Sequence, residues 1–524
     1  MGKSFNTNSI SSFASNIAKK MKAFFIGNRY HILQIAIFVV VSSVFVLVFS
    51  QSTSPLYKNY YAYGGAHDSG DSLQFLTIGK EWSNGKVPYR DNFDHKGPFI
   101  FLIDALGFLI GGGTRYGICL FQIIALTITL FYIYKIGNLV SKDKSVGYLS
   151  IIATLIFYSL SYVVGNSVQE YNLPFIAISV YFIVAYLGDY KKDKNSSHDP
   201  KKALFYGIAI GICFCTLITN AILICVGVLA IAIKLIAEKR YKNLWKNIKY
   251  GIVGFLAILL PFSLYFAAND CFGDFIYSTL LFNFQYTGNI GSWLKTANSD
   301  AIVSFITVFF SYLSIFITII FAISRRAKYY VAMLVFACVL ETYLFFSAQS
   351  FNQYATLSLI QIVLLINEIY ICLKGGRNLA PVALVTSFIV TLICYNQVLA
   401  SVYYVSGMYK GIRDVASIGY EELVEEVLPE IHESSFVAYG GNDLKGIYLR
   451  YDIPLNNKYF TIQDWHSSFS PNVREAILED FKQSSAEYAL LPNVASEGIE
   501  EILENDYKII NANDKYRLFK KIAE

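Results

Sequence analysis

The stretch LQIAIFVVVSSVFVLVFS (33–50) carries no charged side chain, and DSGDSLQFLTIGKEWSNGKVPYRDNFDHKGP (68–98) follows it with four aspartates, three lysines, an arginine and a histidine. An apolar run of the first kind is long enough to cross a bilayer as a helix. The 524-residue chain is 55% hydrophobic and 15% charged, whereas soluble proteins carry about 25% charge. The sequence therefore predicts a polytopic α-helical membrane protein.

Further apolar runs bring the number of predicted transmembrane helices to about 11. The predicted spans are 31–50, 116–135, 146–164, 172–188, 203–219, 221–237, 249–268, 301–323, 329–346, 355–373 and 379–402.

Basic side chains alternate along the connections between these spans. Groups of lysine and arginine follow every second span, whereas the later connections on the other side, including 269–300, contain a single lysine. The positive-inside rule then places the N-terminus in the cytoplasm and the C-terminal tail outside. The alternation requires that GPFIFLIDALGFLIGGG (97–113) does not span, so we predict an interfacial or re-entrant helix there.

Charge divides the chain into three predicted parts. Residues 1–30 form a basic segment, either an amphipathic helix on the cytoplasmic surface or a disordered tail. Residues 31–410 form the transmembrane domain, with its outer loop at 51–115. Residues 411–524 contain 21 acidic and 11 basic side chains. In this last part, predicted strands at 435–440, 458–462 and 486–491 alternate with predicted helices at 471–483 and 495–506, which indicates a small extracytoplasmic α/β domain.

The first outer loop holds the residues best suited to chemistry. Asp71 begins an amphipathic stretch, DSLQFLTIGKEW, which we expect at the headgroup level. Asp94, His95 and Lys96 stand just before the chain becomes apolar again. An acid and a cation at the membrane surface can abstract a proton and neutralise a phosphate. They can equally be solvated ion pairs of little energetic weight.

This loop resembles the first outer loop of the GT-C membrane glycosyltransferases, which include protein-mannosyltransferases and aminoarabinose transferases. The shared pattern is an acid after the first span, a helical stretch ending in Gly, then Pro-Tyr-Arg-Asp and Asp-x-Lys-x-Pro. The resemblance covers roughly residues 30–410 and is specific in this loop. Its positions here are Asp71, Gly85, Pro88, Tyr89, Arg90, Asp91, Asp94, Lys96 and Pro98.

The resemblance implies sugar transfer from a polyprenyl-phosphate donor to a cell-surface glycan or polymer at the outer face of a bacterial cell membrane. No nucleotide site and no nucleic-acid partner is expected. Asp71 would be the general base of an inverting displacement, with Asp68 as its competitor. Lys96 would bind the donor phosphate, with Arg90 second. His95 and Tyr89 would contact substrate.

Several residues outside this loop complete the candidate site. Glu170 would orient the acceptor or hold a divalent cation such as Mg²⁺ or Mn²⁺, or it is simply a helix N-terminal acid. Glu341 is an intramembrane acid and hence a functional candidate. The resemblance implies cations at two further places where this chain has neutral residues. These are Thr219 with Asn220, and the loop around residue 350. The remaining predicted substrate contacts are Gln349, Gln353, Tyr354, Asn283 and Tyr286.

Two other functions stay open. A transporter or flippase of lipid-linked sugars would need repeated spans and helices broken near the midplane, and the sequence shows neither. An inactive GT-C-like assembly partner is consistent with the missing cations at Thr219, Asn220, Gln349 and Gln353.

Overall fold

The computed structural model describes most of the chain up to residue 287 and parts of it beyond. The described residues are 29–58, 70–162, 164–188, 197–287, 329–330, 332–337, 340, 356, 359–374, 409–410, 412–414, 417–432, 435–440, 442–460, 471–484, 486–493 and 497–522. The segment 1–28, the predicted spans 301–323 and 379–402, and much of 329–346 lie outside them.

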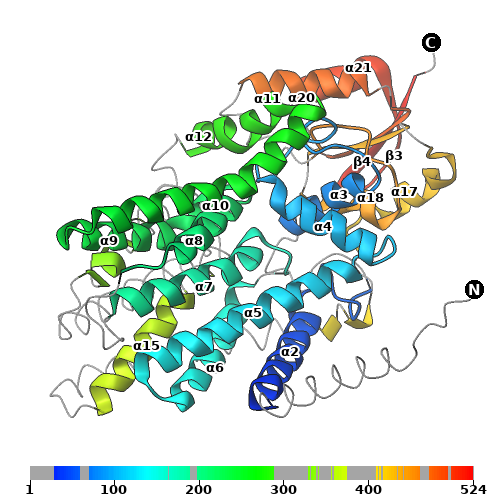
Figure 1. The fold of residues 1–524 in the computed structure, drawn as a ribbon. Helices are drawn as coiled ribbons and strands as arrows, with labels where there is room; N and C mark the ends of the chain where they lie inside the picture. The colour runs from blue at the N-terminus through cyan, green and yellow to red at the C-terminus, as the bar shows by residue number, and fades with distance from the viewer. Residues whose placement is uncertain are drawn as a thin grey trace, which may run out of the picture.

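Long apolar helices form one bundle (Figure 1). Five of them, in the described part of the chain, are long and apolar enough to cross a membrane. Shorter helices accompany them at α6 (Lys144–Ser161), α8 (Pro200–Phe214) and α15 (Leu359–Lys374). The five are α2 (Arg29–Phe49), α5 (Tyr116–Ser141), α7 (Val168–Leu187), η1 with α9 (Ile218–Ala221 and Ile222–Ala237) and α10 (Tyr241–Ala268).

The predicted spans that fall on described residues coincide with these helices, and the total of 11 stays a prediction. Polar caps fix where several helices begin: the side chains of Asp143, Ser167 and Asp199 accept hydrogen bonds from the first-turn N–H groups of α6, α7 and α8. Such caps satisfy donors that a helix start leaves unpaired.

Two helices of the first outer loop lie at one end of the bundle. Helix α3 (Gly70–Ser83) coincides with the predicted amphipathic stretch, and α4 (Pro98–Ile110) lies within the predicted interfacial segment. At about 1.5 Å per residue, the 13 residues of α4 extend roughly 20 Å, less than the hydrocarbon thickness of about 30 Å. The short elements α11 (Phe272–Ile276), η2 (Tyr277–Leu281) and α12 (Phe282–Thr287) follow α10 toward this end.

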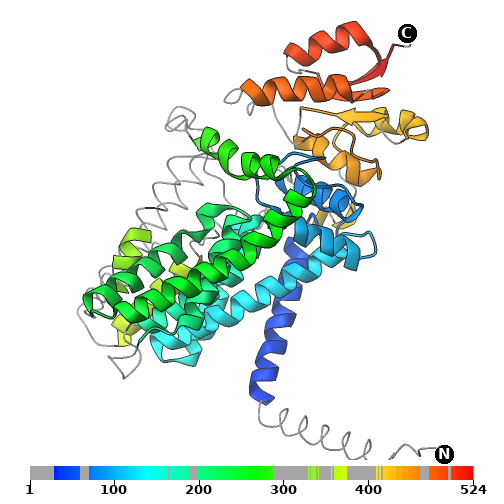
Figure 2. The ribbon, with the colours of Figure 1, turned by 45° about the horizontal axis from the view of Figure 1, so that its top comes forward.

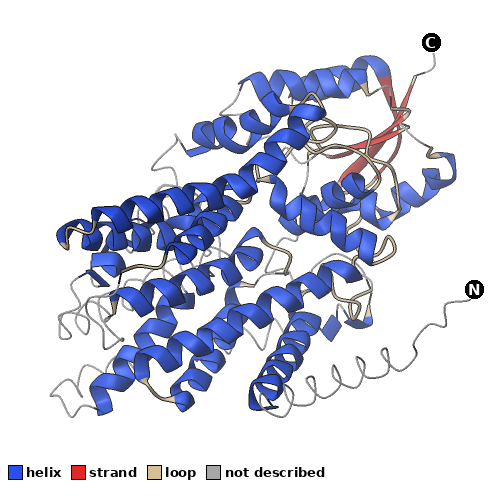
Figure 3. Cartoon of the chain, viewed as in Figure 1, coloured by secondary structure: helices blue, strands red, loops and turns tan. Residues whose placement is uncertain are grey.

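The later part of the chain forms a four-stranded sheet at the same end of the bundle (Figures 2 and 3). Its order is β1-β2-β4-β3, with β1 parallel to β2 and the other pairs antiparallel. The elements are α17 (Glu421–Val427), η5 (Leu428–Glu430), β1 (Phe436–Ala438), η6 (Asn442–Gly446), α18 (Ile447–Arg450), α20 (Pro471–Gln483), β2 (Tyr488–Pro492), α21 (Glu497–Asp506), β3 (Tyr507–Ala512) and β4 (Tyr516–Lys521).

The predicted strand at 458–462 is wrong where it can be compared, because residues 458–460 form a turn and the last two positions lie outside the described residues. Strands β3 and β4 were not predicted. They pair as a hairpin around Asn513–Lys515, where the Asn513 side chain accepts backbone hydrogen bonds from Lys515 and Tyr516.

Alternate residues of the strands face two different cores, as the period of two in a strand requires. Val437, Ala489 and Phe519 pack with side chains of α20 and α21. Phe436, Leu490 and Leu518 instead belong to a core that also contains side chains of α3 and α4. The C-terminal part of the chain therefore shares one core with the first outer loop, and its elements η6 and α18 pack against α3.

Candidate functional site

Two glycines hold the first outer loop against its neighbours. A Cβ atom at Gly79 would lie 2.3 Å from the Cβ of Asp104, so α3 and α4 can approach this closely only with glycine there. A Cβ atom at Gly97 would lie 2.2 Å from the carbonyl carbon of Cys215. The Gly97 N–H donates to Thr216 O over 2.8 Å, which fixes the loop to the end of α8.

The turn at 85–92 is held in an unusual conformation. Tyr89 has φ of 69° although it is bulky and buried, and a side chain in this left-handed region is strained. Its N–H donates to Asn92 O over 2.8 Å, and its hydroxyl donates to Lys96 O over 2.7 Å. Tyr89 thus sets the path of the chain as far as Lys96.

Arg90 is engaged by its neighbour Asp91. Its Nε and Nη2 atoms each lie 2.9 Å from a carboxylate oxygen of Asp91, which also accepts the Val87 N–H over 2.6 Å. Partial burial alone would raise the pKa of Asp91, but the Arg90 guanidinium and the Val87 N–H outweigh it and lower this pKa. The Arg90 side chain is 45% exposed, so it stays open to a ligand.

Asp94 is a buried carboxylate with incomplete hydrogen bonding. Oδ1 accepts the Lys96 N–H over 2.7 Å, whereas no described residue donates to Oδ2. Burial raises the pKa of Asp94 to about 6; Lys96 and, more weakly, Lys445 act against the shift, and Asp71 adds to it. Asp71, exposed in the first turn of α3, is therefore electrostatically coupled to this group.

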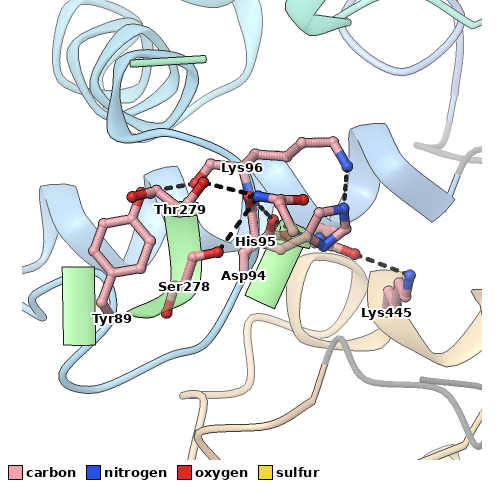
Figure 4. A network of polar contacts seen from close by, with 9 residues as sticks. Tyr89, Asp94, His95, Lys96, Ser278, Thr279 and Lys445 are labelled. Atoms are coloured by element: carbon pink, nitrogen blue, oxygen red, sulfur yellow. Dashed lines mark hydrogen bonds and ion pairs between the residues drawn. The ribbon is translucent and has the colours of Figure 1, made fainter. Parts of the chain in front are cut away.

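Lys96, His95 and Asn283 meet beside Asp94 (Figure 4). Lys96 Nζ contacts His95 Nε2, which must accept because an ammonium group has only donors. The Asn283 side chain on α12 donates to His95 O over 2.8 Å and to Thr279 O over 2.9 Å. Residues almost 190 positions apart therefore share one cluster.

The C-terminal part contributes residues that the sequence did not indicate. Lys445 Nζ donates to Gln74 Oε1 over 2.9 Å, and the Thr77 hydroxyl donates to Lys445 O over 3.2 Å. The Phe93 N–H donates to Lys458 O over 2.7 Å. These partners lie far apart in the sequence, so no local motif could have indicated the contacts.

Glu170 lies in a second polar cluster at the start of α7. Its carboxylate accepts from Tyr162 Oη over 2.6 Å, Gln122 Nε2 over 2.9 Å and the Asn166 N–H over 3.0 Å. The Asn166 side chain donates to Asp104 Oδ2 over 2.9 Å. Glu170 is thus buried and bonded on both oxygens.

The remaining predicted residues are only partly visible. Asn220 is buried in η1, and neither side-chain polar atom has a hydrogen-bond partner among the described residues. Tyr286 belongs to α12, but its side chain is not described. Asp68, Glu341, Gln349, Gln353 and Tyr354 lie outside the described residues.

The visible acids do not fit a metal site. Within the part of the chain that the structure describes, no three His, Cys, Asp or Glu side chains gather closely enough to hold a cation. We therefore assign no step to Mg²⁺ or Mn²⁺.

Two solved structures that share this fold are those of ArnT and of an oligosaccharyltransferase. ArnT from Cupriavidus metallidurans bound to undecaprenyl phosphate matches with a TM-score of 0.53 and 16% identity, over 94% of this chain and 98% of ArnT. The oligosaccharyltransferase of Archaeoglobus fulgidus, in a complex with Zn and sulfate, matches with a TM-score of 0.50 and 11% identity, over 87% of this chain and 68% of that one. The chain therefore has the fold of the GT-C class.

A family profile also matches most of the chain. Residues 30–380 match the family described as "Putative competence-induced protein Ccs4 N-terminal domain", and the chain belongs to that family. No curated protein matches the sequence.

Proposed function

We propose that this protein is an integral membrane glycosyltransferase that moves a sugar from a polyprenyl-phosphate donor to a cell-surface glycan or polymer. It would act at the outer face of a bacterial plasma membrane, with its N-terminus cytoplasmic. The observation that carries the proposal is the electrostatic coupling of exposed Asp71 to the Asp94–Lys96 cluster. The fold of ArnT, whose structure holds undecaprenyl phosphate, supports the class of donor.

In the proposed reaction, Asp71 accepts the proton of the acceptor hydroxyl as that oxygen attacks the anomeric carbon of the donor sugar. The bond from this carbon to the phosphate oxygen breaks, the configuration inverts, and the lipid phosphate leaves with the electron pair. Its new negative charge requires nearby cations, which Lys96 and Arg90 would supply. Asp68 remains the alternative base.

Other residues would bind the substrates. Figure 4 shows His95 and Tyr89 in contact with Lys96. Asn283 donates to the carbonyl of His95, and Tyr286 follows it on α12. Gln349, Gln353, Tyr354 and Glu341 stay proposed contacts to sugar or acceptor. Glu170 is better suited to supporting the helix ends, because neutral donors already bond both of its oxygens.

The experiment is donor binding by the full-length protein in nanodiscs, with undecaprenyl phosphate as the probe. Lys96→Gln should weaken binding roughly 10- to 100-fold, since a charged hydrogen bond to phosphate contributes about 1.5–3 kcal/mol. Lys86→Gln is the matched control, because Lys86 is an exposed lysine of the same loop. Equal binding by wild type and both variants would refute the assignment of Lys96.

A non-catalytic assembly partner is the second candidate. The neutral residues Thr219 and Asn220, at positions where the resemblance to GT-C enzymes implies a cation, favour it. Wild-type protein that binds undecaprenyl phosphate, but whose deletion leaves every surface glycan unchanged, would support this alternative. Movement of lipid-linked sugar across vesicles without glycosylation would instead indicate a flippase.

A further inference from the structure

The C-terminal part of the chain places a buried lysine in the first outer loop. Lys445, in η6, is only 4% exposed, and its ammonium donates to Gln74, which is equally buried. Burying an ammonium group is costly unless it is paired. Lys445 therefore belongs to the interior of the site and is not a solvated surface charge.

The position of Gln74 connects this lysine to the proposed base. Asp71, Gln74 and Thr77 follow one another at intervals of three on α3, so they lie along one face of that helix. Gln74 and Thr77 both bond to Lys445, through its ammonium and its carbonyl respectively. The C-terminal segment thus holds the face of α3 that begins with Asp71.

Lys445 also acts on Asp94. The groups that face this carboxylate are Lys96, Lys445, Asp71 and His95, whose Nδ1 lies 3.9 Å from Asp94 Oδ1. Tyr89 is a fifth neighbour. Burial raises the pKa of its hydroxyl, and the nearby charge of Asp94 raises this pKa further. Figure 4 shows Asp94 with Lys96 and Lys445. With Lys445 in place, these two lysines balance the two carboxylates of Asp94 and Asp71. Without it, Lys96 alone would face both Asp71 and Asp94.

We propose that Lys445 is a positioning residue of this site: it holds Gln74 beside Asp71 and shares the charge of Asp94, so that Lys96 stays available to an anionic headgroup. The last part of this inference rests on the proposed function. Lys445 itself need not touch the substrate.

The test compares undecaprenyl phosphate binding by full-length variants in nanodiscs at about pH 7.5 and about pH 5, on either side of the Asp94 transition. At the higher pH, Lys445→Met should weaken binding roughly three- to tenfold, the size of coupling between neighbouring charged residues. At the lower pH Asp94 is protonated and the difference should shrink. Lys445→Arg should restore binding.

Lys458→Met is the matched control, because it removes a charge from the same segment, where Lys458 pairs with Asp274 at 3.6 Å. It should leave binding unchanged at both values of pH. In an Asp94→Asn background, Lys445→Met should no longer have a pH-dependent effect. A loss that is equal at both values of pH, or that persists in this background, would overturn the inference.

A ligand-free measurement separates this inference from the proposed function. If wild type bound no undecaprenyl phosphate, the proposed function would fail, but the pH dependence of thermal unfolding would still report the coupling. Lys445→Met should move the transition that Asp94 causes to higher pH, and Lys458→Met should not. An unmoved transition would show that Lys445 does not act on Asp94.

Discussion

Two acidic clusters in this protein are bonded in different ways. Asp71 and Asp94 lie with Lys96 and Lys445, one of the acids is exposed, and the other has an oxygen with no partner among the described residues. Glu170 accepts three hydrogen bonds from neutral groups, namely Gln122 of α5, Tyr162 just after α6 and the N–H of Asn166 before α7. Charged groups with unused bonding capacity suit a ligand, whereas a saturated buried carboxylate suits rigidity.

The largest expected effect is that of Asp71→Asn on sugar transfer. An amide cannot accept the hydroxyl proton, so transfer should fall roughly 10²- to 10⁴-fold. Donor binding and membrane insertion should stay normal, because Asp71 is exposed and Lys96 is unchanged. Transfer is measured on the surface glycan that disappears when the gene is deleted. Full transfer by this variant would show that Asp71 is not the general base. The cluster of Asp71 and Asp94 would then not differ from that of Glu170 by a catalytic role.

Glu170→Ala should act on stability. It leaves the Tyr162 hydroxyl and the Asn166 N–H without their acceptor, whereas the Gln122 amide keeps Ser50 Oγ and Tyr162 Oη as acceptors; the loss should cost about 2–4 kcal/mol in the free energy of unfolding. Denaturation of the purified protein measures this loss. Transfer per folded molecule should change little. A variant of normal stability that had lost transfer would place Glu170 in the chemistry.

Asp94→Asn should stabilise the protein above about pH 6. The folded pKa of Asp94 is raised from 3.8 to about 6, so the folded state binds the proton more tightly, and stability increases as the pH falls from above 6 to below 4. The ionised group therefore costs up to about 3 kcal/mol near neutral pH, and the amide removes that cost. Unfolding curves from about pH 4 to pH 8 measure it. Identical slopes in wild type and variant would contradict the assignment.

Arg90→Gln should have the smallest effect. Its side chain is 45% exposed, and an ion pair that an exposed guanidinium makes with a phosphate should contribute about 0.2–1 kcal/mol, as exposed pairs do. Donor affinity should fall less than about fivefold, and the difference should diminish at high salt. Binding titrations at two salt concentrations test this. A loss as large as that of Lys96→Gln would make Arg90 an equal phosphate ligand.

Local patterns predicted much of the helical architecture. The amphipathic repeat beginning at Asp71 became α3, and the helices α20 and α21 coincide with their predicted periodicity to within two residues. The β3–β4 hairpin was not predicted, although Asn513 and Asp514 are turn-forming residues and stand between two runs with strand-forming residues. KYF at 458–460 contains strand-forming residues, but the chain turns there. The Lys458 carbonyl accepts from the Phe93 N–H, and the Lys458 N–H donates to Asp480.

The candidate site was predictable only where its residues are close in sequence. The order from Asp71 to Lys96 is a local motif, so resemblance could indicate it. Gln74 and Lys445 carry no such signal, because their contact depends on how η6 packs onto α3. The hydrogen bonds that Gln122 and Asn166 donate to Glu170 likewise carry no local signal, because they depend on how α5 packs beside the start of α7.

The contact between Lys445 and Gln74 also has a consequence for biosynthesis. The two residues are 371 positions apart, and ribosomes add about 5–20 residues per second. Roughly 20 to 75 s must therefore pass between the synthesis of α3 and that of its buried partner. During this interval the loop lacks its second lysine, so a nascent chain would carry an unfinished site until its C-terminal segment has been synthesised.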